Sequence, residues 1–216
     1  VTGLSGTLVN DLLFLAGDST LLLLLMGAFS SFLLGIGMTV TAAYVFLAIV
    51  LAPALIQGGL DPMSVHLFIL YWGMLSFITP PVALGAFAAA SIAGSSALAT
   101  GFTAMRLGSI IYFIPFFFVL EPAMVMSCTW TDTLIATVKV AIGIILIASC
   151  LQRYLIGVGF LDREGLVGIS GRLLIALGGG LIALPATEVI DINVGQMTLF
   201  IAGAIAAILG VLMSRA

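Results

Sequence analysis

Long apolar runs separated by short polar links constrain this chain more than any other feature. Hydrophobic residues make up 62% of its 216 residues, and only 7% are charged. In a soluble domain about a quarter of the residues are charged. This chain therefore has too few charged residues to cover the surface of a soluble protein of its size. The apolar content also excludes a disordered chain, and six basic residues at a net charge of −3 exclude a nucleic-acid-binding protein. The composition therefore predicts a polytopic membrane protein whose main partner is the lipid bilayer.

The apolar runs predict helices, because none of them shows the alternation of a membrane-spanning strand. They cover residues 21–34, 40–56, 67–92, 107–120, 134–151, 166–184 and 198–212. A spanning helix takes about 20 apolar residues. The fold class expected is therefore an all-α polytopic membrane protein.

Charged residues at the ends of the runs predict the orientation, since Lys and Arg favour the cytoplasmic side. Placing Arg106 inside puts each later basic link inside and each acidic link outside. The residues concerned are Arg153, Arg163 and Arg215 inside, and Asp132, Glu188 and Asp191 outside. Residues 21–56 then form a re-entrant hairpin with both ends outside, and about five elements cross the membrane, one of them broken. Lys139 alone disagrees, and snorkelling towards the interface accounts for it.

Two segments break helical structure at membrane depth: the hairpin tip, residues 34–44, and residues 76–83. Such backbone is tolerated only where it is buried in protein or lines a cavity. Pro81 has no N–H and Pro80 is pushed from helical geometry, so the carbonyls of about residues 76–78 lose their partners. Carbonyls and threonine hydroxyls are hard ligands for a small cation such as Na⁺, and a half-helix beginning near Pro81 suits an anion. Transporters build sites in this way. A proline kink and glycine packing are the structural alternatives.

Several short segments match one family. They are Leu34-Gly35-Ile36-Gly37-Met38-Thr39-Val40-Thr41-Ala42-Ala43-Tyr44, Leu51-Ala52-Pro53-Ala54-Leu55, Asp61-Pro62, Ile78-Thr79-Pro80-Pro81-Val82-Ala83-Leu84, Thr103-Ala104-Met105-Arg106-Leu107-Gly108 and Ile114-Pro115-Phe116-Phe117-Phe118. The first 125 residues or so closely resemble the fused permease subunit of tripartite ATP-independent periplasmic (TRAP) transporters. The remaining residues resemble the variable C-terminal extension of fused permeases more weakly.

The resemblance implies Na⁺-driven uptake of organic acids, which a periplasmic solute-binding protein delivers to a multi-pass permease in the bacterial inner membrane. Na⁺ is the coupling ion, and no other cofactor is implied. The permease would have two inverted repeats and an elevator-type mechanism. Residues 1–126 would be the second repeat, with a hairpin at 21–56, a broken helix at 67–92 and a helix at 107–126. Residues 127–216 would be an extension of three transmembrane helices, so the chain looks like a C-terminal fragment.

The resemblance also implies the site. The tip would face the break, and the coupling ion would favour a nearby substrate carboxylate. The expected binding residues are Gly35, Gly37, Thr39 and Thr41 at the tip and Ser76, Thr79, Pro80 and Pro81 at the break, with Na⁺ held by Gly35, Gly37, Thr41, Ser76 and Thr79. The family usually reads Gly-Met-Pro-Thr-Thr at the tip, whereas Thr39 and Val40 stand here in place of Pro and the first Thr. The backbone geometry of the tip is therefore less constrained than in the usual family motif.

Two other functions stay open at this stage. Gly3-Leu4-Ser5-Gly6 matches a short segment of intramembrane serine hydrolases, which would need His66 to activate Ser5. His66 is more simply a structural residue at the outer end of a span. A non-transporting membrane scaffold is the third reading. Cys128 and Cys150 show neither metal-site nor disulfide spacing.

Overall fold

The structure is a computed structural model that describes residues 4–17, 19–125, 129–184 and 195–215. Its contacts divide the chain into two compact units, Val1–Val125 and Met126–Ala216. Helices dominate both units, and one two-stranded hairpin accompanies them in the second. The protein is an all-α membrane protein.

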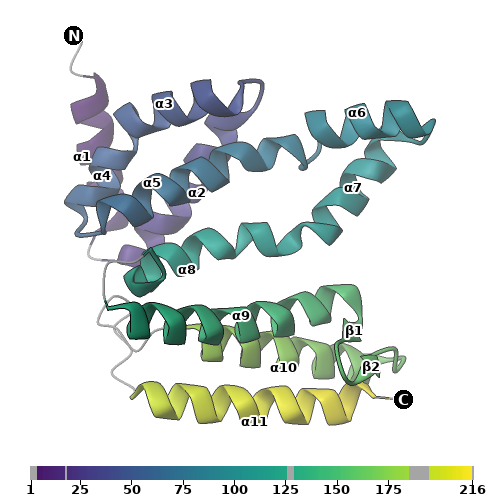
Figure 1. Ribbon diagram of the computed structural model, residues 1–216. Helices are drawn as coiled ribbons and strands as arrows, with labels where there is room; N and C mark the ends of the chain where they lie inside the picture. The colour runs from purple at the N-terminus through teal and green to yellow at the C-terminus, as the bar shows by residue number, and fades with distance from the viewer. Residues whose placement is uncertain (1–3, 18, 126–128, 185–194, 216) are drawn as a thin grey trace. The chain divides into compact units, whose positions relative to one another are not determined.

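The N-terminal unit is a chain of short helices (Figure 1). In order they are α1 (Leu4–Ala16), α2 (Thr20–Gly35), α3 (Val40–Val50), α4 (Ala52–Gln57), α5 (Pro62–Met74), η1 (Leu75–Phe77), α6 (Leu84–Ala93), α7 (Ala97–Leu107), η2 (Ser109–Tyr112), α8 (Ile114–Leu120) and η3 (Pro122–Val125). Helix α5 is central, because it packs against α2, α3, α4 and α8. Its Val65, Phe68 and Ile69 side chains are fully buried.

Local capping explains where three of these helices begin. The Ser19 hydroxyl accepts a hydrogen bond from the Leu22 N–H, and Thr39 does the same for Ala42. The Asp61 carboxylate accepts one from the Ser64 N–H at 2.9 Å, and Pro62 occupies the first turn of α5. These are favoured residues at helix N-termini.

Two helix predictions from the apolar runs are wrong, and one helix was missed. Residues 40–56 form α3 and α4, because Pro53 has no N–H for an uninterrupted helix. Residues 107–120 are not one plain helix: α7 ends at Leu107, and its axis is bent by 66° from that of Ser109–Leu120. Gly108 and Pro115 mark these breaks. Helix α1 was not expected at all.

The broken helix is present where the two prolines predict a break. Helix α5 tightens into η1, which ends at Phe77, and α6 begins at Leu84. Ala83, the last residue before α6, has a left-handed backbone conformation (φ 36°), which is uncommon for a residue with a Cβ. Figure 1 shows α6 continuing beyond this irregular segment.

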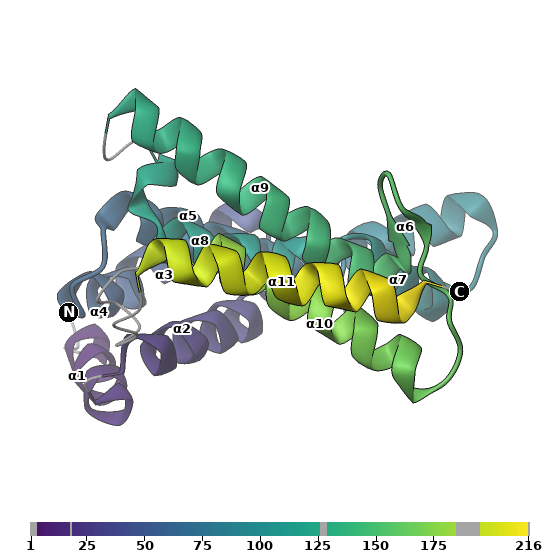
Figure 2. The same cartoon turned by 90° about the horizontal axis from the view of Figure 1, so that it is seen from below.

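The C-terminal unit consists of α9 (Trp130–Gln152), α10 (Leu166–Ala183) and α11 (Gln196–Ser214), with a hairpin of β1 (Tyr154–Leu155) and β2 (Gly159–Phe160) between α9 and α10. Helix α10 packs against both α9 and α11, and Figure 2 shows the three helices from below. This β1–β2 hairpin lies between two apolar runs, where the sequence predicts only a polar link.

Glycine pairs bring the three helices of this unit into backbone contact. A Cβ on Gly143 or Gly179 would lie 2.5–2.6 Å from the partner's carbonyl oxygen, so α9 and α10 touch there. The same holds between α10 and α11 for Gly178 with Gly203 and for Gly171 with Gly210, at 2.5–2.8 Å. Small residues at crossings allow membrane helices to pack in this way.

Among the described residues, three helices are long and apolar enough to cross a membrane, namely α9, α10 and α11. The bent pair Ala97–Leu107 and Ser109–Leu120 would make a fourth if it forms one span. The other apolar helices of the N-terminal unit are shorter, so the expected five-element arrangement and the re-entrant hairpin stay predictions.

Candidate functional site

The hairpin tip meets the broken helix at Gly35. The Ser76 hydroxyl donates a hydrogen bond to the Gly35 carbonyl oxygen at 3.0 Å and lies 3.4 Å from that of Gly73. All three residues are buried. A Cβ on Gly35 would collide with the Gly73 carbonyl. Glycine at position 35 therefore permits this contact between the end of α2 and the end of α5.

Thr79 ties the break to a second irregular segment. Its side chain is only 8% exposed, and its hydroxyl donates to the Leu75 carbonyl oxygen at 2.7 Å. The Thr79 hydroxyl also forms a hydrogen bond with the Tyr112 hydroxyl of η2. A threonine hydroxyl has one proton and two lone pairs. Because its proton goes to Leu75, Tyr112 donates to Thr79, and one lone pair of Thr79 remains for another ligand.

The two prolines leave backbone oxygens without helical donors. In a helix the carbonyls of Ser76 and Phe77 would accept from the N–H groups of residues 80 and 81, and proline has none. The Pro80–Pro81 peptide bond is cis. Pro80 packs on α7, where a Cβ on Gly101 would lie 2.9 Å from its Cγ, while Pro81 is exposed.

Three further tip residues expected in the site have other surroundings in the structure. Gly37 has a positive φ of 79° and open space around the position of a Cβ. The Thr39 hydroxyl caps α3, as described above, and Thr41 is exposed on the first turn of that helix. The structure thus brings Gly35 to Ser76, with Thr79 one turn further along the chain. The roles expected for Gly37, Thr39 and Thr41 stay predictions.

A cavity of about 250 Å³ lies between the tip and the break. Its described lining residues are apolar: Val40, Met74, Leu75, Phe77, Ile78 and Ile111. Among the described residues there is also no group of three or more His, Cys, Asp or Glu side chains that could hold a metal ion. The polar atoms that meet at this junction are the hydroxyl of Ser76 and the carbonyl oxygens of Gly35 and Gly73.

Tyr112 and Gly73 are residues of this site that the sequence analysis missed. Gly108, which separates α7 from η2, signals an irregular segment at Tyr112. Nothing in the sequence pairs that segment with Thr79, because the contact spans 33 residues. Gly73 carries no local signal, since it lies inside an apolar helix.

The family is decided by a comparison with protein-family models. The model described as the DctM component of the tripartite ATP-independent periplasmic transporter matches residues 1–133, more than half of the chain. The chain belongs to the DctM family. The resemblance to TRAP permeases is thereby confirmed, and the family is one of transporters. No curated protein and no solved structure gives a significant match. Most of the C-terminal unit lies beyond the region that the DctM model matches.

DctM membership disfavours the reading as a serine hydrolase, and the surroundings of His66 agree with a structural role. The Tyr44 hydroxyl lies 3.1 Å from His66 Nδ1, and the two rings meet edge to face. This contact joins α3 of the hairpin to the first turns of α5. The side chain of Ser5 lies outside the described residues.

Proposed function

We propose that this DctM-family chain forms part of a permease that imports organic acids together with Na⁺ across the bacterial inner membrane. A periplasmic solute-binding protein would deliver the substrate. The observation that carries the proposal is the junction of Gly35 with Ser76, beside Thr79, where oxygen acceptors lie next to an interrupted helix.

The oxygens at this junction suit Na⁺ as the coupling ion. Ser76 donates its only proton to Gly35, so both of its lone pairs remain, and Thr79 keeps one. The carbonyls of Ser76 and Phe77 add two acceptors that no proline can satisfy. Hard oxygen ligands of this kind bind small hard cations. Ser76 and Thr79 are buried, so their oxygens can replace water around the ion.

The absence of charge around the cavity supports an anionic substrate. None of the described residues that line it is charged. A bound Na⁺ would then keep its full positive charge towards its neighbours, and an organic carboxylate is the ligand that such a charge favours. Each ligand strengthens the other's binding by the same factor, which is the thermodynamic basis of symport.

The proposed movement follows the elevator scheme implied for the family. Residues 1–126 would act as the second inverted repeat, with α2 and α3 as the hairpin and α5 and α6 as the broken helix. Closing the tip on the break would complete the ion site, and opening it would release both ligands. Residues 127–216 would be a C-terminal extension of three transmembrane helices.

Uptake in proteoliposomes tests the proposal. The full-length permease, reconstituted with its binding protein, should accumulate a radiolabelled organic acid under an inward Na⁺ gradient and not under a K⁺ gradient of equal size. Thr79→Val should abolish uptake, while Thr79→Ser, which keeps the hydroxyl, should retain it. Equal uptake with Na⁺ and K⁺, or full uptake by T79V, would contradict the proposal.

A further inference from the structure

One end of the helical bundle in the C-terminal unit carries all four arginines of that unit. A small apolar core holds this end together. Leu155 of β1, Leu161 and Ile175 of α10 are buried in it, and Leu146 of α9 and Val211 of α11 pack against them. Figure 1 shows the β1–β2 hairpin and the C-terminus at the same end of the bundle. We call it the arginine end, defined by Arg153, Arg163, Arg172 and Arg215.

Backbone carbonyls position two of the guanidinium groups. Arg172 donates a hydrogen bond from Nη1 to the Leu161 carbonyl oxygen at 3.1 Å, so its side chain reaches from the second turn of α10 back towards the β1–β2 hairpin. Arg163 Nη1 lies 3.5 Å from the Met213 carbonyl oxygen of α11. A guanidinium has five N–H donors, so both arginines keep further donors for an anion.

The arginine end has more positive than negative charge. The other charged residues between α9 and α10 are Asp162 and Glu164, which are exposed and leave an excess of two positive charges at this end. In the described part of the chain, neither carboxylate forms an ion pair with these arginines. Arg153 and Arg215 are exposed as well. An anion from outside the protein would therefore complement this end.

The lengths of the helices place the arginine end at a membrane interface. Helices α9, α10 and α11 have 23, 18 and 19 residues, or roughly 27–35 Å, and the hydrocarbon core of a bilayer is about 30 Å thick. Their ends therefore lie near the lipid headgroups. Three apolar side chains of the β1–β2 hairpin are exposed there, namely Tyr154, Ile156 and Phe160. Aromatic side chains favour this level of the membrane.

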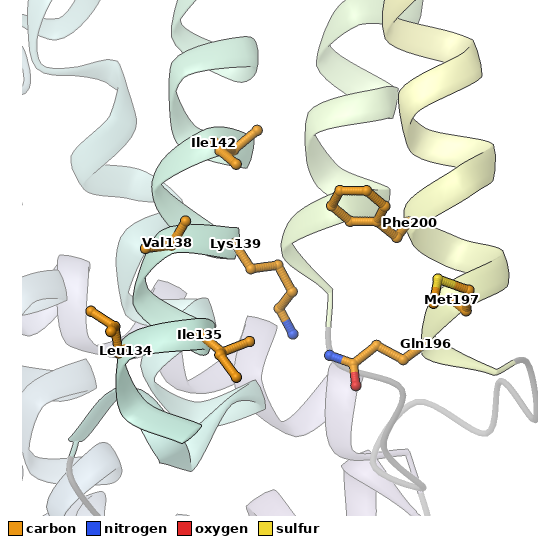
Figure 3. A pocket seen from close by; sticks show the side chains of 8 residues that line it. All are labelled: Leu134, Ile135, Val138, Lys139, Ile142, Gln196, Met197 and Phe200. Atoms are coloured by element: carbon orange, nitrogen blue, oxygen red, sulfur yellow. The ribbon is translucent and has the colours of Figure 1, made fainter. Parts of the chain in front are cut away.

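The opposite end of the bundle differs in character. There α9 and α11 border a groove in which Lys139 and Gln196 are the only polar residues among the described lining (Figure 3). Lys139 already has an interaction within the protein, so its charge is not counted as available. Four of the six basic residues of the chain lie at the arginine end instead. The two ends would therefore meet the lipids of their leaflets differently.

We propose that the arginine end binds an anionic phospholipid, with the phosphate on Arg163 and Arg172 and an acyl chain against the exposed side chains of the β1–β2 hairpin. A guanidinium can hold two phosphate oxygens through parallel hydrogen bonds. The excess positive charge favours an acidic headgroup over a zwitterionic one, by about fivefold for each arginine. The proposal does not depend on the transport function, because every residue it uses lies in the C-terminal unit.

Native mass spectrometry of the full-length permease tests the headgroup contact. Phosphatidylglycerol should bind more tightly than phosphatidylcholine, and Arg163→Gln and Arg172→Gln should each weaken phosphatidylglycerol binding by about fivefold. Asp162→Asn changes the charge at the same end by one unit in the opposite direction, so it should strengthen that binding. Arg163 is exposed, so R163Q should melt like the wild type. Equal binding of the two lipids, unchanged binding in both arginine variants, or weaker binding in D162N would overturn the proposal.

A second set of measurements separates a lipid from a free phosphate or a polypeptide. Soluble glycerol phosphate should not displace phosphatidylglycerol, because it lacks the acyl chain. Phe160→Ser, at a side chain that is 71% exposed, should weaken both lipids, while Ile201→Ser, near the other end of α11, should leave binding unchanged. A photo-crosslinking residue at position 156 should form a lipid adduct in membranes. Displacement by glycerol phosphate, unchanged binding in F160S, or a cross-link to protein alone would overturn the proposal.

Discussion

Replacing Gly35 with alanine should separate the hairpin tip from the broken helix. The added Cβ meets the Gly73 carbonyl oxygen, which belongs to helix backbone and cannot turn aside as a side chain can. Overpacking of this kind costs about 1–3 kcal/mol. If the tip moves away to relieve it, the hydrogen bond from Ser76 to Gly35 is also lost, at a net cost of about 1 kcal/mol.

Strain of about 1–3 kcal/mol in the closed junction lowers its population by roughly 5- to 150-fold. Uptake by Gly35→Ala should therefore fall at least several-fold in the proteoliposome assay. Ser76→Ala removes the hydrogen bond together with an oxygen proposed to bind Na⁺, without adding bulk, so uptake should fall at least about fivefold. Gly73→Ala should be mild, because its Cβ would lie 3.2 Å from the flexible Leu47 Cδ1.

Gly180→Ala is the matched control. Position 180 is helical and has open space for a Cβ, so alanine should be tolerated and even favoured by about 1 kcal/mol. Each variant should be compared at equal amounts of reconstituted protein. Wild-type uptake by G35A, or a loss in G180A as large as that in G35A, would refute the steric reasoning.

Further predictions concern other contacts. Tyr112→Phe removes the donor to Thr79, so the Na⁺ concentration for half-maximal uptake should rise several-fold; an unchanged Na⁺ titration would show that Tyr112 does not orient Thr79. Gly178→Ala should destabilise the packing of α10 on α11 by about 1–3 kcal/mol, seen as earlier thermal unfolding in detergent, and equal melting of G178A and G180A would contradict it. Tyr44→Phe and His66→Ala should show a coupling energy of about 1 kcal/mol in a double-mutant cycle on unfolding, and additive effects would contradict a direct bond.

Much of the fold can be predicted from local chemistry. The interruption after Phe77 follows from two adjacent prolines, and the starts of α3 and α5 follow from Thr39 and Asp61 as capping residues. The three C-terminal helices follow from apolar runs of spanning length. The breaks at Pro53 and Gly108 also carry sequence signals, but the continuous apolar runs obscured them.

Tertiary contacts could not be predicted in the same way. The tip offers several small and hydroxyl residues of similar chemistry, and only the packing of α2 on α5 selects Gly35 as the one that meets Ser76. The hydroxyl of Thr39 is used to cap its own helix. The bond of Tyr112 to Thr79 depends on how η2 folds back.

Direct Na⁺ binding tests the central claim, which is that hydroxyl and carbonyl oxygens beside the broken helix hold the coupling ion. Binding of ²²Na⁺ to the purified full-length permease can be measured by scintillation proximity without any transport step. The wild type, Thr79→Ser and Gly180→Ala should bind ²²Na⁺ in a saturable way, and Thr79→Val should lose most of that binding while remaining folded. Wild-type affinity in T79V would contradict the account.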